Sequence, residues 1–322
     1  MPSTAGVTPT PYLPASGARL NQLQHPCVRD LAWCLNSPAI YRLGHDCRNL
    51  WGNTEALWHW LQQLDRHPQP LLDSISQQRS HRLGIYFETL FGFALTHYLK
   101  PAKNFYALAV RHRNRTVGEY DFLVRLQGEP ALRHVEVSIK FYLGLPTADD
   151  HACWTGLNRN DRLTDKRDKM LYQQLRLSRQ TAARQQLADL GEQIGPCHGV
   201  MMGRLFYPFA KPRLDPPTGA QSNHLRGWWI RQSELKQLIA TADRRQAIAS
   251  ATLLVPLQRR QWLAPLSPLE AEQLASARQA MTETDQPGMR ARLINTPRGW
   301  REHDRGIVVE DKWLDSVFEA LE

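Results

Sequence analysis

The chain has 322 residues, in which 40 lysines and arginines outnumber 31 acidic residues and give a formal net charge of +9. This length is sufficient for a sizeable hydrophobic core, and the basic excess favours nucleic acid as a partner. No apolar stretch is long enough to cross a bilayer, and the first residues lack the basic start and apolar core of a secretory signal. We therefore expect a cytoplasmic protein without membrane partners.

The N-terminal quarter divides into a tail and a helical part. Residues 1–22 are rich in proline and small polar residues and are expected to form a disordered tail. Residues 23–75 contain helix-forming stretches that prolines interrupt and end, which predicts a helical N-terminal extension.

The rest of the chain alternates helices and strands. Within residues 76–207 the patterns predict a helix over 76–99, strands over 104–112, 119–126 and 133–143, a helix over 166–190, and a strand from Cys197. Residues 208–322 begin with a proline-rich loop and predict a C-terminal α/β extension or a second lobe. The expected fold class is α/β (α+β), with a mixed central β-sheet flanked by helices.

The strand at 119–126 has a charged and an apolar face. Successive side chains of a strand alternate between its two faces. Glu119 and Asp121 are therefore expected on one side, with Tyr120 and Phe122 on the other.

The strand at 133–143 repeats this arrangement. Its apolar residues 135, 137, 139 and 141 leave Glu136, Ser138 and Lys140 on the opposite face. A turn at residues 127–130 lets the two strands pair as a hairpin and places Asp121 beside Glu136. Alternating charges of this kind describe a solvated face or cross-strand ion pairs equally well.

A third acid, Glu88, lies in a helix that is apolar nearly all round. Such a helix is expected to be buried, and a buried carboxylate needs a partner or a cation. Carboxylates are the ligands that Mg²⁺ or Mn²⁺ prefers, and a bound metal activates water and stabilises charge on a phosphate. The three acids together favour a metal site for phosphodiester hydrolysis.

These residues resemble the PD-(D/E)XK nuclease superfamily, in which a helix acid precedes a strand Asp and then a (D/E)-x-K strand. The resemblance implies a restriction-endonuclease-like core over residues 76–207. It implies Glu88, Asp121 and Glu136 as metal ligands and as catalytic residues, with Lys140 as the catalytic cation.

The chain resembles more closely an uncharacterised bacterial family, domain of unknown function 1853. This likeness covers most of the chain and is carried by stretches that begin at Val28, Gly84, Val135, Trp154, Asp161 and His224. The stretches Lys140-Phe-Tyr-Leu and Arg226-Gly-Trp-Trp are the more specific ones. It implies kinship without an established activity.

The sequence departs from the superfamily pattern at one position. Lysine is expected two residues after the second acid, but Ser138 stands there and Lys140 lies four residues on. Four strand residues span about 13 Å, against about 7 Å for two. An alternative register would make Ser138-Ile139-Lys140 the motif, but a hydroxyl is a poor substitute for a carboxylate on a hard cation, which favours Glu136.

A basic segment follows the second strand. Eight lysines or arginines and three aspartates lie between residues 159 and 184, on a predicted amphipathic helix. The expected nucleic-acid contacts are Arg159, Arg162, Lys166, Arg167 and Lys169. Accessory site candidates are Glu119, Ser138, Asn158, Asp161 and Gln174. For Asp161 or Asp165 the competing interpretation is a helix N-cap, and a solvated face explains the basic run equally well.

We therefore predict a nuclease that uses Mg²⁺ or Mn²⁺ and acts on DNA more readily than on RNA. The alternative is a catalytically degenerate protein of the same fold that binds nucleic acid or acts as a scaffold. The five cysteines form no Cys-x-x-Cys pair, so free thiols and no structural zinc are expected. The sequence leaves open whether the chain forms a homo-oligomer.

Overall fold

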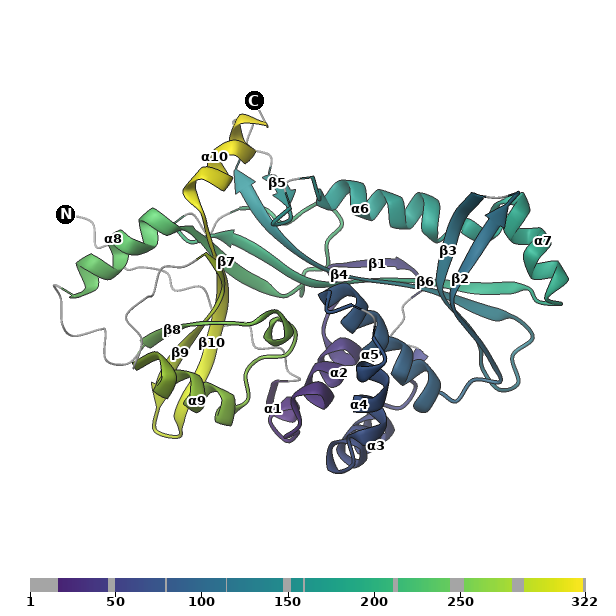
Figure 1. The fold of residues 1–322 in the computed structure, drawn as a ribbon, viewed down its shortest axis with the longest axis horizontal. Helices are drawn as coiled ribbons and strands as arrows, with labels where there is room; N and C mark the ends of the chain where they lie inside the picture. Colours follow the sequence, from purple (N-terminus) through teal and green to yellow (C-terminus); the bar gives the residue numbers. More distant parts are fainter. Residues whose placement is uncertain are drawn as a thin grey trace.

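One mixed β-sheet runs through the whole molecule. The computed structural model describes residues 17–45, 50–78, 80–113, 115–146, 152–158, 160–210, 214–243, 252–279 and 287–320. Within these ranges, ten strands form a single sheet in the order β2-β3-β4-β6-β7-β10-β9-β8, with β1 paired to β6 and β5 paired to β4. Figure 1 shows the long strands β4 and β6 in the middle and helices on both sides of them. The expected mixed α/β architecture is confirmed.

The N-terminal part is helical, with one strand. It contains α1 (Gly17–Leu20), α2 (Pro26–Asn36), β1 (Tyr41–Gly44), α3 (Thr54–Arg66) and α4 (Gln69–Ser76). Residues 17–22, assigned from the sequence to the tail, are ordered because Leu20 is buried in the main core. Residues 1–16 of that tail lie outside the described residues.

The central part has the expected helix, three strands, helix and strand, together with a short strand, β5, that was not predicted. Its elements are α5 (Leu83–His97), β2 (Lys103–His112), β3 (Arg115–Arg125), β4 (Leu132–Pro146), β5 (Ala152–Thr155), α6 (Leu163–Lys169) and β6 (Ile194–Pro208). β2, β3 and β4 pair antiparallel, whereas β6 pairs parallel to β4 after the helical crossover. β4 therefore lies inside the sheet, between a hairpin partner and a parallel partner.

The predicted helix over 166–190 is broken into pieces. α6 gives way to a π-helical turn at Met170–Gln174, a short 3₁₀ turn at Leu177–Arg179, and α7 (Thr181–Asp189). Met170 and Leu175 pack with α6 in one apolar cluster, whereas Leu177 packs with α7 in another. One straight helix does not serve two separate clusters, so the segment changes direction between them.

The C-terminal strands extend the same sheet. They belong to the run β7 (Arg226–Arg231), α8 (Gln232–Asp243), β8 (Thr252–Pro256), a 3₁₀ turn at Arg259–Trp262, α9 (Pro268–Gln279), β9 (Gly288–Thr296), β10 (Gly299–Val309) and α10 (Asp311–Glu319). β7 pairs parallel with both β6 and β10, which joins this half to the central part. No helix among the described residues has the length and apolar character needed to cross a membrane.

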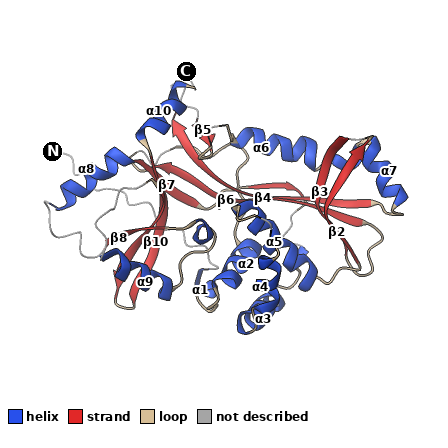
Figure 2. Cartoon of the chain, viewed as in Figure 1, coloured by secondary structure: helices blue, strands red, loops and turns tan. Residues whose placement is uncertain are grey.

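Two apolar layers cover the two faces of the sheet beside β4. On one face, Val135 and Val137 pack in the largest cluster with α2 and α5. On the other, Tyr142 and Tyr120 belong to clusters formed with the segment from α6 to α7. Figure 2 shows α2 to α5 on one side of β4 and α6 with α7 on the other. The alternation along β4 agrees with the sequence pattern, since Glu136 contacts Gln174 and Lys140 contacts Asp161 on the α6 side.

Gly203 on β6 is the position where the central sheet tolerates a side chain least. Its φ is +133°, and a Cβ there would lie 1.6 Å from the backbone oxygen of Lys140. We expect Gly203→Ala to lower the free energy of unfolding by at least about 2 kcal/mol, measured by urea titration. Gly84→Ala in α5 is the control, because its Cβ would meet nothing within 4 Å. Equal stability of the two variants would contradict this packing.

Candidate active site at a strand fork

The pairing between β3 and β4 stops where the acids begin. Backbone register runs from Val124 opposite Arg133 to Phe122 opposite Val135. Beyond this point the Asp121 carboxylate accepts a hydrogen bond from the Val137 amide at 2.9 Å. We call this place, where the two strands separate, the strand fork.

The fork is closed by a reciprocal contact. The Glu136 carboxylate accepts from the backbone amide of Asp121 at 3.3 Å. Side-chain oxygens thus replace backbone carbonyls as acceptors, and the amides at the fork stay paired although the strands part. Asp121 and Glu136 lie side by side, as the hairpin pattern predicted.

Glu136 is fully buried, which excludes the solvated-face interpretation for this residue. Its Oε1 lies 2.6 Å from Nε2 of His134, and its Oε2 accepts from the Gln174 amide at 2.6 Å. Gln174 in turn accepts from Nζ of Lys166 at 3.1 Å. A chain of polar contacts therefore runs from Lys166 in α6 through the π-helical turn to the strand acid.

Glu88 approaches the fork from α5, on the other side of the sheet. Burial and the negative charges of Asp121 and Glu119 raise its pKa to about 7, while the Lys166 ammonium opposes that shift. Glu88 thus interacts electrostatically with Asp121, which in turn contacts Glu136. We call these three carboxyls, from one helix and two strands, the acidic cluster. Glu119 itself is exposed.

Each carboxyl of the acidic cluster has a raised pKa. Burial, then the charge of Glu136, raises the pKa of Asp121 to about 7. Burial also raises the pKa of Glu136 to about 7, against its hydrogen bonds and the Lys166 charge. Burial lowers the pKa of His134 to about 4, so this histidine is a neutral neighbour of Glu136. The cluster is short of positive charge.

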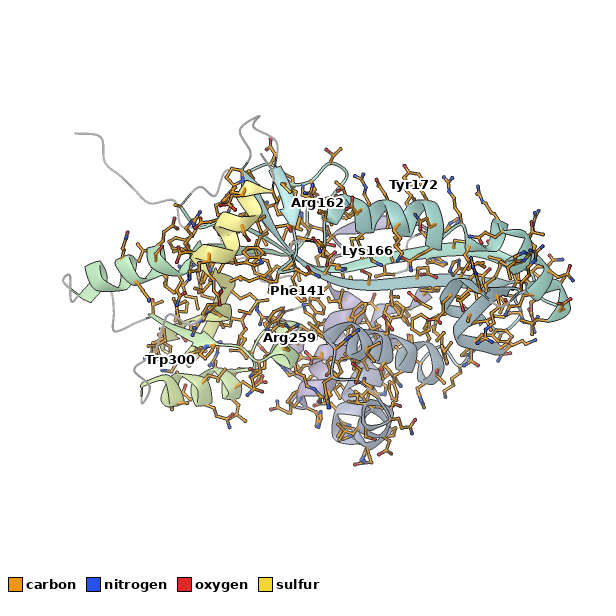
Figure 3. The ribbon with its side chains drawn as sticks, turned by 45° about the horizontal axis from the view of Figure 1, so that its top comes forward. Phe141, Arg162, Lys166, Tyr172, Arg259 and Trp300 are labelled. Carbon is orange, nitrogen blue, oxygen red and sulfur yellow. The ribbon has the colours of Figure 1, made fainter. Side chains whose placement is uncertain are left out.

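The lysine that acts on all three carboxyls is Lys166. It is half-buried, and burial with the nearby Lys140 charge lowers its pKa. Figure 3 shows Lys166 on the side of its helix that faces the strands, whereas Tyr172 points outward. The sequence pattern assigned Lys166 to nucleic-acid contact and to the polar residues near the cleft, but not to a pairing with the three acids.

Lys140 makes a different pair. Its Nζ lies 2.6 Å from Oδ2 of Asp161, and the Tyr142 hydroxyl donates to Oδ1 of the same carboxylate at 2.9 Å. Asp161 is therefore engaged by β4 and is no helix cap; Arg162 stands at the N-cap position of α6 without a side-chain bond. The assignment of Lys140 as the catalytic cation stays a prediction.

The remaining predicted residues lie around this arrangement. Ser138 is buried on the same face as Glu136, and its hydroxyl has no hydrogen-bond partner in the described part of the chain. Asn158 holds the turn before α6, where its side chain accepts from the Asn160 amide at 3.3 Å. Arg162 and Lys169 are exposed, whereas Arg167 pairs with Asp168 at 2.8 Å. Arg159 lies outside the described residues.

Two features of the site were missed by the sequence patterns. His134 contacts Glu136; the alternation of faces places both on one side of the strand, but the sequence patterns did not assign His134 to the site. Tyr120 packs on the His134 ring, and it shares an apolar cluster with Leu123 whereas Phe122 faces the main core. Strict alternation of faces is therefore interrupted in β3 beside Asp121.

The donor set fits a divalent cation held by few protein ligands. Among the described residues no three side chains of His, Cys, Asp or Glu converge as a ready-made metal cage. Mg²⁺, however, is commonly held by one or two carboxylates and keeps several waters. The buried pair Asp121 and Glu136 has that composition, and the unpaired hydroxyl of Ser138 on the same face is a polar group available to a bound water.

Asp121→Asn tests the lack of countercharge directly. The folded pKa near 7 lies above the unfolded value near 4, so wild-type protein loses stability as pH rises between them. Asn keeps an acceptor for the Val137 amide but does not titrate. We expect the free energy of unfolding of the variant to be about 1–3 kcal/mol higher than that of wild type at pH 8 and equal to it near pH 4. Urea titrations in the presence of EDTA measure this.

The control is Glu319→Gln, which changes an exposed acid in α10. It should show no gain of this size at either pH. A wild-type protein that is as stable as Asp121→Asn at pH 8 would contradict a charge-deficient cluster.

Comparison with known proteins gives one family match, and the matched range contains the whole candidate site. A family model described as Domain of unknown function (DUF1853) matches residues 29–309, which include the acidic cluster, His134, Lys166 and Gln174. No curated protein and no solved structure matches the chain. The chain belongs to the DUF1853 family.

Proposed function

We propose that this protein is a nuclease that hydrolyses phosphodiester bonds in DNA with Mg²⁺ or Mn²⁺. The observation that carries the proposal is the buried pair of carboxylates at the strand fork, with Glu88 on one side and Lys166 on the other. The resemblance to the PD-(D/E)XK superfamily supports the same reaction. The order of helix, three strands and helix that this resemblance implies is present as α5, β2, β3, β4 and α6, with the short strand β5 inserted before α6.

In this proposal Asp121 and Glu136 hold the metal. A bound divalent cation supplies Lewis acidity, which lowers the pKa of water and stabilises charge on a phosphate oxygen. The backbone amide of Val137 fixes the Asp121 carboxylate, and the side chains of His134 and Gln174 fix that of Glu136. Rigid ligands of this kind hold their geometry without reorganising during the reaction.

Lys166 is the better-placed cation for the reacting phosphate. It opposes the raised pKa values of Glu88, Asp121 and Glu136, so its charge acts on the whole cluster. Lys140 neutralises Asp161 instead. We therefore assign to Lys166 the orientation of the attacking water or the stabilisation of the leaving charge, and to Gln174 the positioning of Glu136.

One observation favours a second candidate, a degenerate protein that binds nucleic acid without cutting it. Both oxygens of Glu136 already have partners, Oε1 in His134 and Oε2 in Gln174. If these contacts replace a metal rather than orient its ligand, catalysis is lost and only the basic surface remains. Activity measurements separate the two candidates.

The nuclease proposal predicts cleavage that depends on metal and on the acid pair. Purified protein with Mn²⁺ or Mg²⁺ should nick supercoiled plasmid or shorten linear DNA, and EDTA should stop the reaction. Asp121→Asn and Glu136→Gln should each lower the rate at least about 100-fold, because a metal ligand is removed. The exposed-acid variant Glu319→Gln should cut like wild type. Absence of cutting by wild type with either metal, while DNA still binds, would support the degenerate candidate.

The assignment of Lys166 is tested against Lys140. We expect Lys166→Met to lower the cleavage rate by about 10- to 1,000-fold, and Lys140→Met to lower it much less. Loss of the Lys166 charge also raises the pKa values of the cluster, so the rise of activity with pH should shift to higher pH. The pH–rate profiles of both variants give this second measurement. A larger loss of cleavage rate in Lys140→Met than in Lys166→Met would show that Lys140, not Lys166, is the catalytic cation.

A further inference from the structure

A second cluster of positive charge lies beyond the strand fork, at the hairpin between β2 and β3. Arg111, Arg113 and Arg115 are exposed there and follow one another around the turn. A surface groove of about 480 Å³ separates Arg111, His112 and Arg113 from α7, where Gln185 and Asp189 line it. Asp189 accepts from Gln185 at 2.8 Å.

Three further arginines continue this surface toward the site. Arg176 and Arg179 lie on the turns after α6, and Arg184 lies on α7; all three are exposed. α7 and these turns pack on β2 and β3, where Leu177 and Leu187 share a cluster with Val110 and Tyr120. Arg176, Arg179 and Arg184 therefore lie on the same side of the sheet as Glu136 and Lys166, and the groove places Arg111 and Arg113 beside α7. Arg115 follows at the start of β3 and completes a set of six arginines. We call them the arginine surface.

The arginine surface lacks acidic partners. In the described part of the chain, none of its six members forms an ion pair with a carboxylate; Arg176 lies over the exposed Tyr172 ring at 5.2 Å. Arginines elsewhere are commonly paired, as in Arg19 with Glu55, Arg231 with Asp315 and Arg292 with Asp304. Unpaired like charges repel one another, so holding them together is useful where an external anion supplies the opposite charge.

We propose that the arginine surface binds the phosphate backbone of a DNA duplex at a distance from the acidic cluster. Arginine is the side chain best suited to phosphate, because its planar fork donates two parallel hydrogen bonds. Asp121 lies six residues after Arg115 along β3, and six strand residues span at most about 20 Å. This is the length of about six base pairs, so one duplex reaches both places. The inference rests on the proposed function for its substrate class but not for its test.

The experiment measures DNA binding in EDTA, where no cutting occurs. A hairpin variant (Arg111→Gln, Arg113→Gln, Arg115→Gln) and a helix variant (Arg176→Gln, Arg179→Gln, Arg184→Gln) are compared with wild type by fluorescence anisotropy. The probe is a labelled 24-base-pair duplex over a range of KCl concentrations. A control variant, Arg66→Gln, Arg298→Gln and Lys312→Gln, removes the same charge from exposed positions outside the arginine surface.

We expect the hairpin and helix variants to bind at least about tenfold more weakly than the control variant at moderate salt. The slope of log affinity against log salt concentration should become shallower by about 2–3 for each, because three phosphate contacts are lost. Equal affinity and equal slope in the hairpin, helix and control variants would overturn the proposal. Parallel titrations with single-stranded DNA and duplex RNA identify the backbone; a loss confined to either of these would overturn the assignment to duplex DNA.

This test is independent of catalysis. If wild type never cuts DNA but the hairpin variant binds DNA more weakly, the arginine surface is supported and the nuclease proposal is wrong. If wild type cuts DNA but the six substitutions do not change binding, the nuclease proposal is supported and the arginine-surface proposal is wrong.

Discussion

The reciprocal contact at the strand fork is the constraint on which the rest of the site depends. The Asp121 carboxylate accepts a hydrogen bond from the Val137 amide, and the Glu136 carboxylate accepts one from the Asp121 amide. Two strands that part inside a sheet would otherwise leave buried amides without acceptors, at a cost of about 1–3 kcal/mol each. The same two side chains thus keep the backbone satisfied and place two acids next to each other in the protein interior. One pair of residues therefore both accepts the backbone hydrogen bonds and supplies the two carboxylates of the candidate site.

The fork also decides how charge is distributed around the acids. The charge of Asp121 raises the pKa of Glu88 on α5, and Lys166 on α6 lowers the pKa of Asp121, although the two helices cover opposite faces of the sheet. Three acids with pKa values near 7 and one half-buried lysine leave the cluster short of positive charge. An environment of this kind costs folding free energy and is characteristic of sites where a cation or a reacting group supplies the balance. The basic surface outside the fork adds long-range attraction for a polyanion, which a neutral surface would lack.

Local patterns predicted the parts of this site that depend on local geometry. The alternation along β4 and the short turn before it were sufficient to predict that Asp121 and Glu136 lie side by side, and the apolar character of α5 predicted that Glu88 is partly buried. The patterns failed where distant packing decides the conformation. The segment from α6 to α7 breaks after the π-helical turn because Leu175 and Leu177 pack in different clusters, and no periodicity in the sequence reports that. For the same reason a strand at residues 41–44 was missed, since it forms only by pairing with β6. The superfamily motif directed attention to Lys140, whereas the charge that faces the acids comes from Lys166, whose neighbours are equally basic in the sequence.

The central claim is that Asp121 and Glu136 hold a divalent metal at the fork, and a crystal structure soaked with Mn²⁺ tests it most directly. Anomalous scattering identifies the metal without reference to any activity. The account predicts a manganese peak that contacts carboxylate oxygens of both Asp121 and Glu136, lost in crystals of Asp121→Asn. A soaked structure in which both carboxylates keep their present partners and no manganese lies between them would contradict the account.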